Sequence, residues 1–334
     1  MPNNMKPYRR RKITIIILIS LIAGMISACG KPESDPASVQ AESFSQITGP
    51  QLQKDQGRRI ECMFAIPDKN EDSSDIQIAA SVSVPESEIV QGDYEQTMIS
   101  ADQIETILLD GQKMDFVKKQ YSEEVWQIAS DPGSDKAFKI NYTIDSGIKK
   151  SSYDNTSVPN IADIEYTKDQ CPTLEMKDQL DILSEKATDV PSQLGITSKL
   201  LKATIGEEHG YYMANIISVP CLEDVPLVEP EFGFVKDYYF ISNDGVSSMQ
   251  IHGSYSKKNE KKVSVMSVDD MLKIVEEKAE NGEIPGWNDV TYTDITLAYY
   301  LDSGTNRFYP VWYLSSNACD VYICINAQTG ALMS

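Results

Sequence analysis

The chain has 334 residues, with 50 acidic against 30 basic side chains and a formal net charge of -20 at pH 7. Hydrophobic residues make up 41% and charged residues 24% of the sequence, which is typical of a globular protein that buries a core. Residues 1–28 hold five of the basic side chains, so the rest of the chain has 50 acidic against 25 basic residues, a charge of -25. This balance argues against nucleic acid and anionic lipid headgroups as partners, because both are bound by clustered Lys and Arg.

The first thirty residues have the pattern of a secretory signal. A basic stretch at 6–12 precedes an apolar run at 13–26, which is too short for a stable membrane span. The run ends in Ile26-Ser27-Ala28-Cys29, which resembles the lipobox of bacterial lipoproteins. The resemblance implies cleavage before Cys29, alkylation of its thiol by a diacylglycerol donor, palmitate as part of the lipid, and anchoring at the extracytoplasmic face of the cell membrane. An ordinary secretory signal and an uncleaved anchor are the alternatives.

The remainder divides into a tether and two folded parts. Residues 29–50 are rich in Ser, Gln, Glu and Pro, which predicts a flexible tether. We expect an N-terminal α+β domain over 51–165 and a C-terminal α+β domain over 171–334. The predicted fold class is α+β, with antiparallel sheets that are each packed by a helix.

Two strands are expected early in the first domain. Apolar and polar residues alternate in 60–66 and again in 76–84, the period of half-buried strands. The loop between them begins at Asp68 like an EF-hand calcium loop. Ser73 then stands where Gly is required and Ala79 where Glu is required, so a solvated acidic loop is favoured over a calcium site.

A short helix and a further strand follow in the same domain. Ser100 and Gln103 have the spacing of a capping box, which predicts a helix that ends near Gly111. The alternation in 138–144 then predicts a strand.

The second domain contains a pattern that occurs twice, an amphipathic helix followed by β-rich sequence. The first helix is predicted to end at Pro191, after an apolar stripe formed by Met176, Leu180, Leu183 and Ala187. Ser267 and Asp270 resemble a capping box for the second helix, which Gly282 and Pro285 stop. Its apolar face comprises Val268, Met271, Leu272, Val275 and Ala279.

Each predicted helix leads to a similar phrase. The first reads Asp237-Tyr-Tyr-Phe-Ile-Ser-Asn-Asp-Gly245, and the second reads Asp320-Val-Tyr-Ile-Cys-Ile-Asn-Ala-Gln-Thr-Gly330. Asn and Gly supply the left-handed backbone of a tight hairpin, so the likeness has a structural cause. A diverged duplication and two unrelated hairpins both explain it.

The segment around the second phrase, residues 320–330, resembles a known family. The stretches Phe308-Tyr309-Pro310-Val311-Trp312-Tyr313 and 325–331 resemble the closing strands of PepSY-like domains and of extracytoplasmic YycH/YycI-type regulatory proteins. The resemblance covers 267–334, extends more loosely from Cys171, and implies two PepSY-like repeats at about 171–255 and 263–334. Such modules restrain peptidases or act in signalling outside the cell. The whole layout also resembles uncharacterised lipoprotein families of Gram-positive bacteria.

The sequence lacks the common catalytic motifs. It contains no G-x-S-x-G, no H-E-x-x-H, no Gly-rich phosphate loop and no paired C-x-x-C. The two histidines, His209 and His252, are too few for a His-rich metal site. We therefore expect no catalytic residues, no metal and no cofactor.

Six cysteines include Cys29, so five remain in the body of the chain. An odd number leaves at least one thiol free in a monomer. Cys171 and Cys221, each beside a proline, are the best candidates for a disulfide.

Tyr and Trp side chains crowd the last third of the chain. In alternating strands half of them should face outward, and exposed aromatic residues are good interface anchors. Core packing under the two helices is the favoured explanation of this crowding, and the candidate interaction surface is Tyr309, Trp312, Tyr313 and Tyr322.

Taken with the lipobox, these features predict a lipid-anchored binding or regulatory protein that contacts another envelope protein, such as a peptidase. The alternatives are a substrate-binding lipoprotein of a transporter and a hydrolase with an unrecognised acidic site.

Overall fold

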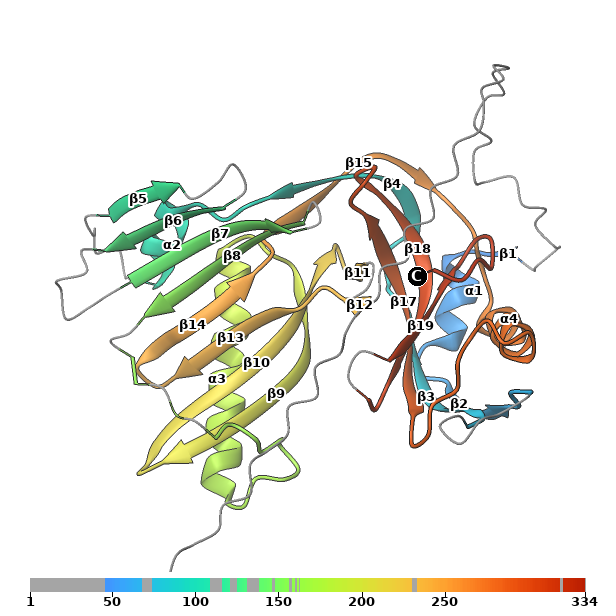
Figure 1. Ribbon diagram of the computed structural model, residues 1–334, viewed down its shortest axis with the longest axis horizontal. Coiled ribbons are helices and arrows are strands. Elements are labelled where there is room, and N and C mark those ends of the chain that lie inside the picture. The colour runs from blue at the N-terminus through green and yellow to red at the C-terminus, as the bar shows by residue number, and fades with distance from the viewer. Residues whose placement is uncertain are drawn as a thin grey trace, which may run out of the picture. The chain divides into compact units, whose positions relative to one another are not determined.

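The computed structural model describes residues 46–67, 74–108, 116–120, 125–130, 138–145, 148–155, 158–159, 161, 163–229, 233–318 and 321–333 (Figure 1). They belong to one compact unit, 41–334. Several features discussed above lie outside the described residues. They are the signal sequence, Cys29, the tether up to residue 45, most of the EF-hand-like loop that begins at Asp68, and Gly111.

One sheet is covered by helix α4 and is called the α4 sheet here. Its main strands, in spatial order, are β2 (Arg59–Phe64), β3 (Ile76–Ser83), β17 (Thr291–Asp302), β18 (Arg307–Ser316) and β19 (Tyr322–Asn326). Neighbours are antiparallel except β3 and β17, which run parallel. Further strands extend it beside β17 and β18, namely β11 (Val225–Glu229), β12 (Gly233–Phe234), β4 (Val90–Thr97) and β15 (Ser254–Lys262).

Short elements and one long helix lie with this sheet. The helix is α4 (Val268–Glu280), and the short elements are β1 (Gln46–Ile47), α1 (Gly49–Leu52), the 3-10 turn η2 (Gln53–Asp55) and β16 (Val265–Met266), which pairs with β1. Buried side chains of α4 and Leu52 of α1 form a single core with the inward residues of β2, β3, β17, β18 and β19.

A second sheet is covered by helix α3 (Leu174–Gln193) and is called the α3 sheet. All its neighbours are antiparallel, in the spatial order β5 (Phe116–Gln120), β6 (Val125–Ser130), β7 (Phe138–Asp145), β8 (Ile148–Asn155), β14 (Gly245–Ile251), β13 (Asp237–Ser242), β10 (Tyr211–Leu222) and β9 (Ser198–Glu208). The short helix α2 (Ala101–Leu108) precedes β5 in the chain.

The mixed α+β class is as predicted, but two details differ. The α4 sheet is not purely antiparallel, because β17 pairs in parallel with both β3 and β11. In addition, β8 pairs with β14 and β3 pairs with β17, so strands from both expected domains share each sheet. The boundary expected between 165 and 171 therefore does not separate two sheets, because strand pairing joins segments far apart in the sequence.

The expected helix starts are confirmed by their caps. Ser100 Oγ accepts a hydrogen bond from the Gln103 amide at 3.2 Å, and the Gln103 side chain accepts one from the Ser100 amide. Ser267 Oγ accepts from the Asp270 amide at 3.1 Å at the start of α4. Thr173, which was not predicted as a cap, does the same for α3. Each hydroxyl satisfies an amide that has no partner inside its helix.

The apolar stripe of α3 is confirmed, but its expected end is not. Met176, Leu180, Leu183 and Ala187 are all buried. Pro191 is buried inside the helix, which continues to Gln193 and ends before Gly195 at φ +75°. A proline removes one amide donor and can be accommodated in a last turn, so here the left-handed glycine marks the end.

Both long helices are followed by strands that pair in chain order. After α3 come β9, β10, β13 and β14, and after α4 come β17, β18 and β19. The first set carries β11 and β12 as an insertion that pairs with β17. The two hairpin phrases form the β13–β14 turn and the turn after β19, where Ile325 bridges Leu332.

Candidate interaction surface

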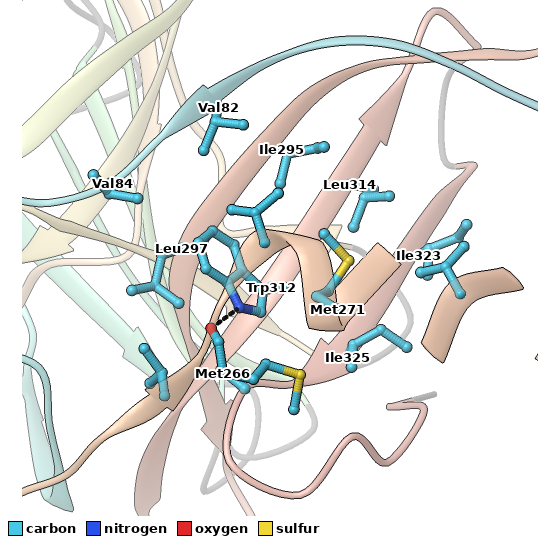
Figure 2. Packing of buried hydrophobic residues seen from close by; sticks show 14 of the residues in the cluster. Val82, Val84, Met266, Met271, Ile295, Leu297, Trp312, Leu314, Ile323 and Ile325 are labelled. Carbon is cyan, nitrogen blue, oxygen red and sulfur yellow. Dashed lines mark hydrogen bonds between the residues drawn. The ribbon is translucent and has the colours of Figure 1, made fainter. Parts of the chain in front are cut away.

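Trp312, one of the four candidate surface residues, is not on a surface. The side chain is fully buried between β18 and α4, and its Nε1 atom donates a hydrogen bond to the Met266 carbonyl at 3.1 Å. Figure 2 shows the ring among aliphatic side chains of the neighbouring strands, with Met271 of α4 close by. Trp312 is therefore part of the core that holds α4 on its sheet.

The opposite face of β18 is also covered, which removes Tyr313 from the candidate surface. Tyr313 is only 5% exposed and packs against Phe234 of β12, with ring centroids 4.4 Å apart. A Cβ atom at Gly233 would lie 2.3 Å from the Tyr313 hydroxyl oxygen, so β12 passes directly over the ring. Alternation predicts opposite faces for Trp312 and Tyr313, but each face has its own covering layer.

Tyr309 and Tyr322 remain partly accessible. Tyr309 stacks on Tyr300 with ring centroids 5.3 Å apart, and Tyr322 contacts Tyr313 at 5.2 Å. Burial raises the pKa of Tyr309 to about 12, so its hydroxyl is neutral at physiological pH. These two half-buried rings are what remains of the predicted aromatic surface.

An apolar groove adjoins Tyr322 and contains a residue that the sequence analysis missed. The groove, called the Trp287 groove here, has a volume of about 320 Å³, and its lining includes Ile284, Trp287, Tyr322, Leu332 and Met333. Trp287 is 48% exposed, far more than is usual for so large an apolar side chain. Its neighbours in the sequence are Gly, Pro and Asn rather than alternating strand residues, so periodicity gave no signal for it.

The loop that carries Trp287 is held in place at both ends. Gly282, at φ +71°, ends α4, and the Glu283 amide then donates to the Lys278 carbonyl. Ser74 Oγ donates to the Trp287 carbonyl at 2.7 Å. Gly286 packs so closely on Ser74 that a Cβ atom would lie 1.9 Å from the Ser74 carbonyl oxygen. The exposed indole is thus presented on an ordered loop.

The histidines do not assemble a recognisable catalytic site. His209 is exposed in a turn at φ +56°. His252 is buried, and Asp237 Oδ1 accepts from its backbone amide at 2.9 Å and lies 2.8 Å from its Nδ1. This pair joins the ends of β13 and β14. Within the described ranges, no group of three or more His, Cys, Asp or Glu side chains could hold a metal ion.

The candidate disulfide between Cys171 and Cys221 is not formed, because both are free thiols. Cys171 is half-buried before α3, where its Sγ donates to the Thr167 carbonyl. Cys221 lies in β10, where burial raises the pKa of its thiol to about 12. The two cysteines are candidates because each is beside a proline, but a proline affects only the local backbone. A disulfide requires that the two Cβ atoms lie about 4 Å apart.

No protein-family model matches this chain, and no curated protein matches it. In structure it is similar to an uncharacterized protein from Eubacterium rectale ATCC 33656, with a TM-score of 0.55 and 12% sequence identity. The alignment covers 85% of this chain and 98% of the other. At this identity the similarity shows the fold alone. In the part of the chain that the structure describes, no helix is long and apolar enough to cross a membrane.

Proposed function

We propose that this chain is a lipid-anchored extracytoplasmic protein that binds another protein of the cell envelope through the Trp287 groove. The observation that carries the proposal is the half-exposed Trp287 on an ordered loop, beside Tyr322 and an apolar hollow of about 320 Å³. The lipobox-like stretch around Cys29 supplies the expected location, outside the membrane at the end of a tether.

The composition of the groove favours a protein partner. Trp and Tyr are enriched among residues that dominate binding energy at interfaces, since they bury a large area with few rotatable bonds. Ile284, Leu332 and Met333 add an apolar floor on which a partner side chain can be desolvated. The groove therefore suits one apolar or aromatic side chain of the partner.

The charge of the molecule indicates what should surround that side chain. Glu283 lines the groove, and Asp289 is exposed two residues after Trp287. Lys278 pairs with Glu283 at 2.8 Å, which leaves Asp289 as an acid without an ion pair among the described residues. A partner with Lys or Arg near its apolar anchor would be steered by the net charge of the protein.

We further propose that the two helix-then-strand segments are PepSY-like repeats. The support is their common order, in which α3 and α4 each precede antiparallel strands paired in chain order. The family resemblance then implies restraint of a peptidase, or signalling outside the cell, as the purpose of the contact.

Crosslinking and co-purification from native membranes test this function. Trp287→Ala should reduce recovery of the specific partner at least about fivefold, since loss of an interface tryptophan commonly costs more than 1 kcal/mol. Leu200→Ala is the matched control, because Leu200 is a 57% exposed apolar residue on the other sheet. Equal recovery with both variants would refute the role of the groove. Cys29→Ala should release the protein from membranes, and an unmodified Cys29 in the mature protein would refute the anchor.

A further inference from the structure

Strand β2 has an open edge in the described structure. It pairs with β3 in a regular register from Arg59–Ser81 to Phe64–Ile76, and no described strand pairs with its other side. The Val82 amide donates to the Arg58 carbonyl, so alternate residues from Arg58 onward bond to β3. The amides and carbonyls of Arg59, Glu61 and Met63 consequently point away from the sheet.

Two other edge strands, β9 and β19, are bridged in part by backbone of a neighbouring segment. Beside β9, the amides of Tyr166 and Ile205 each donate to the carbonyl of the other, at 3.1 and 2.9 Å. Beside β19, the Met333 amide donates to the Cys324 carbonyl at 2.8 Å. The β2 edge differs from these two because its outward amides and carbonyls can form hydrogen bonds with a strand of another chain.

A groove runs between this edge and helix α4. It has a volume of about 440 Å³ and is called the β2–α4 groove here. Its floor is apolar, with Ile60 and Phe64 buried and with Cys62 and Leu272 half-buried. A strand added to β2 would direct alternate side chains into this groove and the others to solvent.

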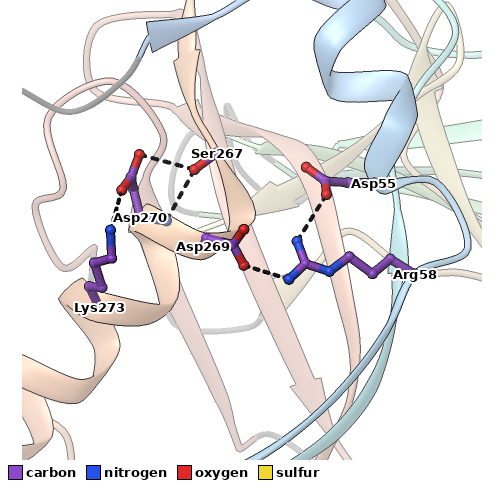
Figure 3. Close-up of polar contacts among 6 residues, drawn as sticks. All are labelled: Asp55, Arg58, Ser267, Asp269, Asp270 and Lys273. Carbon is purple, nitrogen blue, oxygen red and sulfur yellow. Dashed lines mark hydrogen bonds and ion pairs between the residues drawn. The ribbon is translucent and has the colours of Figure 1, made fainter.

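A set of paired charges lies beside the groove, where β2 and α4 begin (Figure 3). Arg58 donates to Asp55 at 3.1 Å and to Asp269 of α4 at 2.5 Å, which links the start of β2 to the start of the helix. Lys273 pairs with Asp270 at 2.9 Å, and Asp270 in turn contacts the capping Ser267. These groups are satisfied within the protein.

The charged residues along the groove that form no ion pair with another described residue are two acids and one base, Arg59 of β2. Glu61 of β2 and Glu276 of α4 line the groove, and neither forms an ion pair with another described residue. Glu276 and Cys62 line the same groove, and burial first and the Glu276 carboxylate second raise the pKa of the Cys62 thiol. The acid therefore stands across the groove from the middle of the strand.

We propose that the β2–α4 groove binds an extended segment of a partner protein, which adds to β2 as a further strand. The segment carries an apolar residue over Cys62 and Leu272 and, two positions along, a Lys or Arg that reaches Glu276. Residues two apart on a strand share a face, so both side chains enter the groove. The site shares no lining residue with the Trp287 groove and does not depend on it.

The geometry disfavours two other occupants. A second copy that paired antiparallel about Glu61 would place two Glu61 carboxylates directly opposite each other, which is destabilising. A helix in the groove would leave the outward amides and carbonyls of Arg59, Glu61 and Met63 without partners. An extended basic segment satisfies both the backbone ladder and the acids.

The test uses the full chain in detergent and a panel of labelled seven-residue peptides in which Thr alternates with Val, Leu or Lys. Fluorescence anisotropy should show binding by peptides that place Lys two positions from an apolar residue. N-methylation of every second amide removes the ladder bonds without changing the side chains, so it should abolish binding. Hydrogen exchange should locate new protection at Arg59, Glu61 and Met63.

Charge reversal provides the matched protein variants. Glu276→Lys should weaken binding of the Lys peptides about tenfold or more and favour peptides with Glu in place of Lys. Glu277→Lys makes the same change at an exposed neighbour outside the groove and should alter the affinity less than about twofold. Trp287→Ala should leave peptide binding intact, which separates this site from the proposed function.

Three results would overturn the proposal. The first is a panel in which nothing binds below about 1 mM, a weak affinity even for a short peptide. The second is equal binding of the N-methylated peptides, and the third is equal weakening by Glu276→Lys and Glu277→Lys.

Discussion

The two helix-covered sheets are built alike, but the edge strand β9 of one differs from the edge strand β2 of the other. Both long helices begin at a hydroxyl cap and bury one stripe of apolar residues. At the edge of the α3 sheet, strand β9 is bridged by Tyr166, and a register shift leaves Leu201 as an extra residue between two exposed lysines, Lys199 and Lys202. Such devices prevent unwanted strand pairing.

Strand β2 of the α4 sheet has a regular register and no bridging segment among the described residues. An unpaired edge strand beside an apolar groove can pair with a strand of another chain. We therefore expect this edge to be a binding site. The comparison teaches that sheets with similarly built cores can carry edge strands of different kinds, one bridged as at β9 and one without a described partner as at β2.

The largest expected effect concerns the core that positions α4. Trp312→Ala should lower the free energy of unfolding by about 3–5 kcal/mol, because it removes a fully buried indole and its hydrogen bond to Met266. Urea denaturation followed by circular dichroism measures the loss. Trp287→Ala, at an exposed indole, should change it by about 0.5 kcal/mol or less. A loss below about 1 kcal/mol for Trp312→Ala would contradict the assigned core.

Hydrogen exchange should next distinguish the two edges. The Ile205 amide, which donates to Tyr166, should exchange at least about tenfold more slowly than the Glu61 amide after correction for intrinsic rates. Within β2 the rates should alternate, because Ile60 and Cys62 bond to β3 and Glu61 does not. Uniformly slow exchange along β2 would mean that its edge is covered.

The caps test whether the two helices are equivalent. Thr173→Ala and Ser267→Ala should each lower the free energy of unfolding by about 1 kcal/mol, since each leaves a first-turn amide without its acceptor. Thr173→Ser and Ser267→Thr keep the hydroxyl and serve as controls. An effect at only one of the two helices would show that their N-termini are not equivalent.

The smallest effect concerns the thiol in the β2–α4 groove. Burial and the Glu276 carboxylate raise the pKa of Cys62, so the thiolate fraction at pH 8 is low. Glu276→Gln removes the charge, lowers that pKa, and should increase the rate of Cys62 alkylation about twofold. Peptide mass spectrometry measures the rate, and Glu277→Gln is the control. An unchanged rate would place the Glu276 charge too far from Cys62 to act.

Local features of the fold could be predicted from the sequence. The strands β2, β3 and β7, the caps at Ser100 and Ser267, and the stripe of α3 all depend on residues within a few positions of each other. The structure confirms each of them.

Features set by distant segments could not be predicted in this way. Trp312 and Tyr313 lie on opposite faces of β18, yet α4 covers one face and β12 covers the other. Trp287 lies in an irregular loop that is held by Ser74, more than 200 residues away. The open edge of β2 likewise depends on what the rest of the chain leaves unpaired, which no local pattern encodes.

Site-specific photocrosslinking in native membranes tests the central claim most directly. A photoreactive residue is placed at Trp287, at Met63 on the β2 edge, or at Leu200 on the β9 strand. We predict that positions 287 and 63 each capture an envelope protein, that the alternating Lys peptide suppresses capture at 63, and that the N-methylated peptide does not. Equal capture at position 200, or capture at neither 287 nor 63, would contradict the account.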